Sequence, residues 1–221
     1  MVDGKQMINI LYEDNHLLVV EKPINIPVQS DKSGDKDLQN ILKKYLKEKY
    51  NKKGNVYLGI VHRLDRPVSG IMVFAKTSKA ASRLSKEIRE KKFNKTYYAV
   101  VEGNIEKEGV LIDKLYKDKI KNISYISNKG LDSKLTYKKL KYKNGLSLIK
   151  INLETGRSHQ IRVQFSSRGY PLYGDQKYNK NAKKAPIALF AGNLSFTHPT
   201  TKETMNFSLP LPNRYPFNLF L

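Results

Sequence analysis

The sequence contains no cysteine, which excludes disulfide bonds, thiolate metal ligands and cysteine nucleophiles. Histidine is also scarce, and the four present, His16, His62, His159 and His198, show no metal-ligand spacing such as H-E-x-x-H. The sequence therefore gives no support for a metal site.

Long apolar runs are missing as well. No window approaches the length needed to cross a bilayer, and the opening "MVDGKQMINILYEDNH" turns polar before a signal-peptide core could form. We therefore expect a cytoplasmic protein with no membrane association. No G-K-[ST] phosphate loop and no G-x-G-x-x-G occurs, so the usual nucleotide cofactors are not expected either.

Acidic residues are few, since 20 Asp and Glu face 41 Lys and Arg, a net charge of +21. Such an excess points to a polyanionic partner, with nucleic acid first, although many of the lysines could simply be solvated. Arginine is the residue of choice for bidentate contacts with phosphate or carboxylate. The arginines cluster in two separate stretches, which predicts one site assembled from both: Arg63, Arg66, Arg83 and Arg89 in one, and Arg157, Arg162 and Arg168 in the other.

The first half of the chain alternates short strands with helices. "INILYEDNHLLVVEKP" (8–23) is typical of two short strands around a polar turn, and the apolar periodicity of 37–50 predicts a helix with lysines on its outer face. "GIMVFAKT" (70–77) reads as a strand covered on both faces. A helix should follow, capped by Thr77 or Ser78. Its expected inner stripe is Ala81, Leu84 and Ile88.

The second half begins with a strand over 94–103 and continues into a weakly patterned, lysine-rich stretch, 105–134, where we expect irregular strands or loops. Two alternating runs within 134–155 are joined by Asn144-Gly145, a pair that favours a tight hairpin turn. A short helix should follow, with Ser158 as its cap, Ile161 and Phe165 on its inner face and Gly169 at its end. The mixture predicts the α+β class with a mixed, mainly antiparallel sheet flanked by helices.

Asp65 stands between Arg63 and Arg66 in "HRLDRPVSG" (62–70). Two neighbouring cations would keep its carboxylate ionised below the usual pKa of about 3.9. On spacing alone Asp65 could equally be a turn residue that bonds its own backbone. "HRLD" differs by one residue from the H-R-D of protein kinases, whose other motifs are absent.

The segment 62–70 closely resembles the motif H-R-L-D-x-x-[TS]-S-G of the RluA-type RNA pseudouridine synthases, whose catalytic aspartate matches Asp65. "NKTYYAVVEG" (94–103) is similar to the K-x-Y-x-A-x-V-x-G strand of this family, which matches the active-site tyrosine to Tyr97. Both matches are long and specific.

A third match, "LETGRSHQIRVQFSSRGYPLYGDQKY" (153–178), resembles the family's L-x-T-G-R-x-H-Q-I-R segment and implies that Arg162 pairs with the catalytic carboxylate. The segments 10–28 and 198–212 are similar to the family's opening and closing segments, so the resemblance covers nearly the whole chain.

Two departures from the family pattern are Val68, where Thr is usual, and "IRVQF" in place of "IRVH". Many members also carry an N-terminal S4 RNA-binding domain. Here the resemblance to the catalytic domain begins at about residue 8. We therefore expect residues 1–221 to form a single catalytic domain, a short form of the family that acts as a monomer.

The resemblance implies an isomerase that converts uridine in RNA to pseudouridine without a cofactor. The N1–C1′ bond breaks, the uracil turns, and C5 joins C1′. Asp65 would act either as a nucleophile at C1′ or as a base at C2′, and the sequence does not choose between them. Arg162 would hold that carboxylate, unless it is an ordinary helix arginine, and Tyr97 would stack on the uracil, unless it is one more strand aromatic.

A uridine in structured RNA must be extruded before its sugar can be reached, so cations beside the site should grip the backbone. Arg63 could fill the vacated space or hold a phosphate. Asp175 is expected to serve a turn or to pair with an arginine. The candidate RNA-binding residues are Arg63, Arg66 and Arg157, together with His62 and His159, which could instead be structural hydrogen bonders.

Other functions remain open from sequence. A non-catalytic basic RNA-binding or ribosome-associated protein of the same fold would be expected to lose Asp65 or Tyr97, and both are present. A metal-dependent nuclease would need clustered carboxylates, which the motif around Asp65 lacks. Whether the substrate is ribosomal RNA, transfer RNA or both is left undecided.

Overall fold

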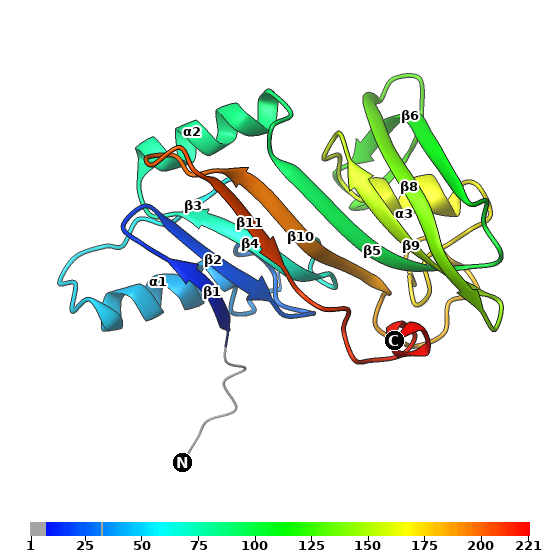
Figure 1. The fold of residues 1–221 in the computed structure, drawn as a ribbon, viewed down its shortest axis with the longest axis horizontal. Helices are drawn as coiled ribbons and strands as arrows, with labels where there is room; N and C mark the ends of the chain where they lie inside the picture. Colours follow the sequence, from blue (N-terminus) through cyan, green and yellow to red (C-terminus); the bar gives the residue numbers. More distant parts are fainter. Residues whose placement is uncertain (1–7, 32) are drawn as a thin grey trace, which may run out of the picture. The chain divides into compact units, whose positions relative to one another are not determined.

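The computed structural model describes residues 8–31 and 33–221, which contain eleven strands, three α-helices and one 3-10 helix (Figure 1). They divide into two compact units. The first holds the residues up to Phe93 together with Leu194–Ser208, and the second holds Asn94–Asn193 and Leu209–Leu221. We describe each unit by itself.

The first unit is built on strands that pair in the order β1-β2-β4-β10, with β3 on β4 and β11 on β10. The register of β2 against β4 runs from Leu17 opposite Ala75 to Lys22 opposite Gly70. All seven residues of β4 are buried, as its unbroken apolar run predicts. The strands are β1 (Asn9–Glu13), β2 (Leu17–Lys22), β3 (Gly59–Ile60), β4 (Ser69–Ala75), the end of β10 (Leu189–Thr197) and β11 (Thr204–Ser208).

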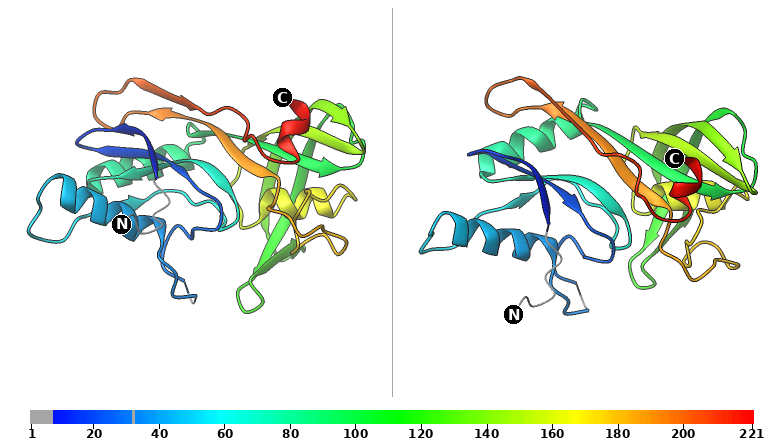
Figure 2. Two further views of the ribbon diagram at one scale, coloured as in Figure 1. Left: turned by 90° about the horizontal axis from the view of Figure 1, so that it is seen from below. Right: turned by 60° about the horizontal axis from the view of Figure 1, so that its bottom comes forward.

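Helices α1 (Leu38–Lys49) and α2 (Ser78–Arg89) lie alongside these strands (Figure 2). The side chain of Asp37 caps α1 by accepting a hydrogen bond from the amide of Asn40, and α1 buries Leu38, Leu42 and Leu46. These leucines follow the expected helical period.

Thr77 caps α2, as expected, by accepting a hydrogen bond from the amide of Ala80. The predicted inner stripe was partly wrong. Leu84 is buried, but Ala81 and Ile88 are only half-buried, and the buried positions beside Leu84 are Ala80 and Glu87. Glu87 is drawn inward because its carboxylate accepts a hydrogen bond of 2.7 Å from the amide of Thr197.

The second unit pairs its strands in the order β10-β5-β9-β8-β6-β7, and β10 enters it with the residues up to Asn193. The hairpin between β8 and β9 turns at Asn144 and Gly145, whose φ angles of 53° and 74° are those the Asn-Gly pair favours. The strands are β5 (Asn94–Glu102), β6 (Glu108–Asp118), β7 (Ile123–Ile126), β8 (Leu131–Lys143) and β9 (Leu146–Leu153).

The expectation of irregular structure over 105–134 was wrong, because β6 is a regular strand paired along its length with β8 and β7. Leu111 and Leu115 point to the buried face of β6, while Val110 and Ile112 on the other face are 55% and 65% exposed. Apolar residues on both faces mask the period-2 pattern by which a strand is predicted.

Helix α3 (Gln160–Ser166) packs against β6 and β7 (Figure 2). Ile161 and Phe165 are buried and Gly169 has a φ of 80°, both as expected. The predicted cap was wrong: His159, with a φ of 55°, precedes the helix and makes no side-chain capping bond. The carbonyl oxygen of the Gln160 side chain accepts from the amide of Arg157 instead.

Every strand pair whose register is given within the two units is antiparallel, which confirms the mainly antiparallel α+β class. Among the described residues, no helix has the length and hydropathy required to cross a bilayer. The expectation of one catalytic domain over 1–221 stays a prediction.

Candidate active site

Asp65 is half-buried in the loop that leads from β3 into β4, in the first unit. Its backbone carbonyl accepts a hydrogen bond of 3.0 Å from the amide of Val68, which closes a tight turn around Pro67. The carbonyl of Arg66 accepts a second bond of 2.9 Å from the amide of Asn25. The loop around Asp65 is thus held by its own backbone and by the segment after β2.

A buried lysine anchors this loop through hydrogen bonds to its backbone. Lys22, at the end of β2, is fully buried, and its Nζ donates to three backbone carbonyls, those of Pro23 (2.9 Å), Arg66 (2.9 Å) and Val68 (2.7 Å). Two of these carbonyls belong to the loop that carries Asp65. Sequence reasoning missed Lys22, although a lysine closing a wholly apolar strand directly before a proline was a signal that could have been followed.

The charges around Lys22 and Asp65 are coupled. Burial lowers the pKa of Lys22 to about 7, and the positive charge of Arg66 acts in the same direction, while the negative charge of Asp65 partly offsets the shift. Asp65 therefore has a buried amine in its electrostatic surroundings that no sequence motif indicated.

Arg66 makes its contacts on an exposed loop of the same unit. Its guanidinium pairs with Asp35 and donates from Nε to the carbonyl of Asn25 (3.2 Å). The role of Arg66 in RNA binding stays a prediction.

His62 occupies a structural position. Its Nε2 accepts a hydrogen bond of 3.1 Å from the amide of Val73 in β4, and its ring lies 5.3 Å from that of Phe93. This is the hydrogen-bonding role that the sequence left open for His62. Arg63, one residue further on, is exposed to solvent, where it could meet a phosphate.

In the second unit, Arg162 of α3 forms a buried, bidentate pair with Asp175. Nε donates to Oδ2 at 2.8 Å and Nη2 to Oδ1 at 2.6 Å, and the two residues are 5% and 1% exposed. Oδ1 also accepts from the amide of Lys177 (3.1 Å), so the carboxylate is fixed by a turn. The expectation that Asp175 pairs with an arginine is confirmed, and the pair fixes the guanidinium plane of Arg162.

Tyr178 contacts the Arg162–Asp175 pair, and the sequence analysis did not select it as a site residue. Its ring lies 5.1 Å from the Arg162 guanidinium, within cation–π range, and its hydroxyl is 2.6 Å from Nδ1 of His159. The same hydroxyl accepts a hydrogen bond of 2.7 Å from the amide of Ser124 in β7. The aromatic "Y" that closes the segment 153–178 was the signal that could have pointed to it.

Tyr97 and Arg157 complete the expected set in the second unit. Tyr97 lies in β5 opposite Ile151 of β9 and is 6% exposed. Arg157, in the loop before α3, is exposed and donates from Nε to the carbonyl of Asp132 (2.9 Å). Within the described part of the chain, no three His, Asp or Glu side chains gather in a group that could hold a metal ion.

Comparison with known proteins decides the family. The model of the RNA pseudouridylate synthase family matches residues 16–167, which include Asp65, Tyr97 and Arg162. The chain belongs to this family. As a pseudouridine synthase it is an isomerase that acts on uridine in RNA, which confirms the resemblance to the RluA type.

Sequence alignments with known proteins extend over most of this pseudouridine synthase. An uncharacterized RNA pseudouridine synthase of Aquifex aeolicus is 33% identical, over 94% of this chain and 71% of that protein. The ribosomal large subunit pseudouridine synthase D of Zymomonas mobilis is 32% identical, over 93% and 69%.

A solved structure, human RNA pseudouridylate synthase domain containing 4, shares the fold of this synthase with a TM-score of 0.79. The two structures superpose over 96% of this chain and 91% of the human chain, and their sequences are 22% identical. This likeness supports the α+β fold of the family for the present chain.

Proposed function

We propose that this synthase isomerises specific uridines in structured RNA, with Asp65 as the catalytic carboxylate and RNA of the large ribosomal subunit as its first candidate substrate. The family match over 16–167 carries the proposal. The names of relatives such as the Zymomonas mobilis enzyme favour ribosomal over transfer RNA, which stays the alternative.

The reaction needs a carboxylate at the ribose. Asp65 either attacks C1′ or takes the proton from C2′, the N1–C1′ bond breaks, and the uracil stays bound while it turns. C5 then joins C1′, and the proton on C5 leaves. The hydrogen bonds from Lys22 to the carbonyls of Arg66 and Val68 support this role, because they hold the loop that carries the reacting group.

Arg162 and Tyr97 are proposed to assist Asp65. Asp175 binds the Arg162 guanidinium through Nε and Nη2, so its orientation is settled before substrate arrives. A guanidinium held in this way can keep a carboxylate ionised and aimed. Tyr97 is proposed to stack on the uracil and to present its hydroxyl toward the departing C5 proton.

Five further residues are proposed to hold the RNA, and the net charge of +21 supports a polyanionic partner. They are Arg63, Arg66, Arg157, His62 and His159. The cytoplasmic location, the monomeric state and the absence of a cofactor stay predictions.

The test is Asp65→Asn, assayed by tritium release from ribosomal RNA transcripts labelled with [5-³H]uridine. An amide can neither attack C1′ nor deprotonate C2′, so turnover should fall by several orders of magnitude. RNA affinity should stay within about tenfold, because the cations that supply it remain. Glu48→Gln, at a side chain of α1 in the same unit that is 65% exposed, is the matched control and should keep wild-type turnover.

Substantial tritium release by a well-folded Asp65→Asn protein would refute the assignment of Asp65. A wild-type protein that binds RNA but releases no tritium would favour the non-catalytic RNA-binding alternative. Carbodiimide-dependent primer extension on total RNA from cells with and without the gene identifies the modified uridine as a stop that disappears.

A further inference from the structure

Residues 127–130 connect β7 to β8, which pair with opposite edges of β6. Leu115 of β6 pairs with Ile126 of β7 on one edge and with Leu131 of β8 on the other, so the connection crosses β6 at this residue. Gly130 permits this close crossing, because a Cβ at this position would lie 2.4 Å from the backbone carbonyl carbon of Leu115. The crossing is therefore a built feature of the second unit.

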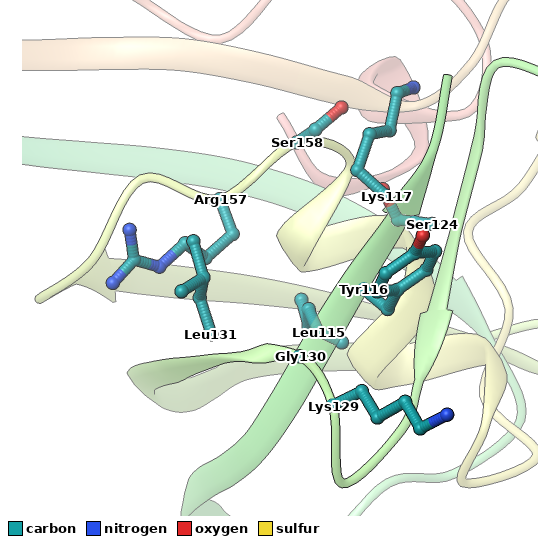
Figure 3. A pocket seen from close by; sticks show the side chains of 9 residues that line it. All are labelled: Leu115, Tyr116, Lys117, Ser124, Lys129, Gly130, Leu131, Arg157 and Ser158. Carbon is teal, nitrogen blue, oxygen red and sulfur yellow. The ribbon is translucent and has the colours of Figure 1, made fainter.

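A pocket of about 260 Å³ opens beside the connection 127–130 (Figure 3). Figure 3 shows Arg157 and Leu131 on one side of it and Tyr116 and Ser124 on the other. Its lining comes from β6, from β7, from the connection 127–130 and the start of β8, and from the loop before α3: Leu115, Tyr116, Lys117, Ser124, Lys129, Gly130, Leu131, Arg157 and Ser158.

The lining combines an aromatic wall, an apolar floor and a cationic rim. The ring of Tyr116 lies 5.4 Å from that of Tyr125 and is 43% exposed, so one face of the pair is open to a flat partner. Lys129 and Arg157 are exposed at the rim, and none of the lining residues is acidic. This combination suits a planar group that carries negative charge.

One buried polar atom in the lining has no partner. Ser124 is 2% exposed, and among the described residues its Oγ makes no hydrogen bond. An unsatisfied buried hydroxyl is unfavourable, and a polar atom of a ligand would supply the missing hydrogen bond. The pocket therefore offers a hydrogen bond as well as a stacking surface.

The pocket is connected to the residues proposed for catalysis within the second unit. The amide of Ser124 donates to the hydroxyl of Tyr178, and the Tyr178 ring lies against the guanidinium of Arg162. The lining residue Ser124 is thus linked to Arg162 through Tyr178.

We propose that this pocket binds one unpaired nucleotide of the substrate RNA, next to the uridine that is isomerised. Its base stacks on Tyr116 and bonds the hydroxyl of Ser124, while Lys129 and Arg157 contact the adjoining phosphate. The volume of about 260 Å³ lies just below the range of about 300–1,000 Å³ for sites of drug-sized ligands, which suits one base and excludes a duplex. The inference deepens the proposed function and rests on it.

The test uses a fluorescein-labelled U12 RNA as probe, with binding measured by anisotropy. Tyr116→Ala should weaken binding at least about fivefold, the lower range of the loss expected when a stacking aromatic is removed. Tyr142→Ala, a similarly exposed tyrosine (49%) of the same unit that does not line the pocket, should change affinity less than twofold.

Lys129→Ala should make the slope of log K against log salt shallower by about 0.7, the contribution of one phosphate contact on a single strand. Lys143→Ala, which lies at the end of β8 outside the pocket lining, is its control and should leave the slope unchanged.

A second measurement needs no variant. U12 containing 5-iodouridine is cross-linked to the wild-type protein by light, and mass spectrometry should locate the cross-link at Tyr116 or Tyr125. Cross-links found only elsewhere, an unchanged affinity for a folded Tyr116→Ala protein, or no binding of U12 by the wild type would each overturn the inference.

The tritium assay separates this inference from the proposed function. If the wild type releases tritium but the pocket variants bind U12 with unchanged affinity, only the assignment of the pocket is refuted. If U12 binds in the pocket but no tritium is released from any RNA, the proposed function falls.

Discussion

Replacing Lys22 with methionine tests the buried amine beneath the loop of Asp65. Methionine keeps the length of the side chain but removes the three donors to the carbonyls of Pro23, Arg66 and Val68. It also removes the titratable amine of Lys22, so the effect of the substitution on the free energy of unfolding should depend on pH in a calculable way.

Folding lowers the pKa of Lys22 from 10.5 to about 7. Between these two values the unfolded chain binds more protons than the folded one, so the contribution of Lys22 to stability rises with pH across this window. From pH 7 to pH 9 the wild type should gain about 2 kcal/mol from this residue. Lys22→Met lacks this gain. The difference in unfolding free energy between the wild type and this variant should therefore grow by the same amount from pH 7 to pH 9.

The assay is urea unfolding followed by circular dichroism at pH 7 and pH 9. Subtracting the variant from the wild type cancels the other titrating groups, which both proteins share. Lys86→Met, at a side chain that is 70% exposed, is the control, and its difference from the wild type should change by less than about 0.5 kcal/mol. A Lys22→Met deficit that stays constant or shrinks toward pH 9 would refute the account of Lys22 as a buried, depressed amine.

Two further predictions concern acid stability and metal dependence. Burial tends to raise the pKa of Glu13, but hydrogen bonds from Lys49, Tyr50, Lys76 and Tyr45 lower it to about 2, so its stabilising effect is complete above pH 4.5 and is lost as pH falls toward 2. Glu13→Gln should therefore reduce the unfolding free energy by about 1–3 kcal/mol at pH 7 and lose less than the wild type between pH 5 and pH 3 in urea titrations. Tritium release by the wild type should persist in EDTA, and a loss that divalent ions restore without refolding the RNA would contradict the prediction of a metal-free reaction.

Local patterns in the sequence predicted the elements whose structure depends on near neighbours. The turn at Asn144 and Gly145 forms because both residues tolerate positive φ, and β4 is buried because every residue in it is apolar or small. The period of Leu38, Leu42 and Leu46 places them on the buried face of α1 for the same local reason. Asp65, Tyr97 and Arg162 were identified by resemblance to a family, since nothing in their local pattern distinguishes a catalytic group from a turn residue or a strand aromatic.

The tertiary structure alone decided which side chains meet. Lys22 donates to the carbonyl of Val68, 46 residues away, and Arg66 pairs with Asp35, 31 residues before it in the chain. The regularity of β6 depends on its pairing with β8, and the pocket depends on the connection 127–130 that crosses β6 at Leu115. Such contacts join residues distant in the chain, and a sequence carries a periodic signal only for neighbours. Burial then gives these contacts their chemical effect, because an amine shifts its pKa only where folding has removed the water around it.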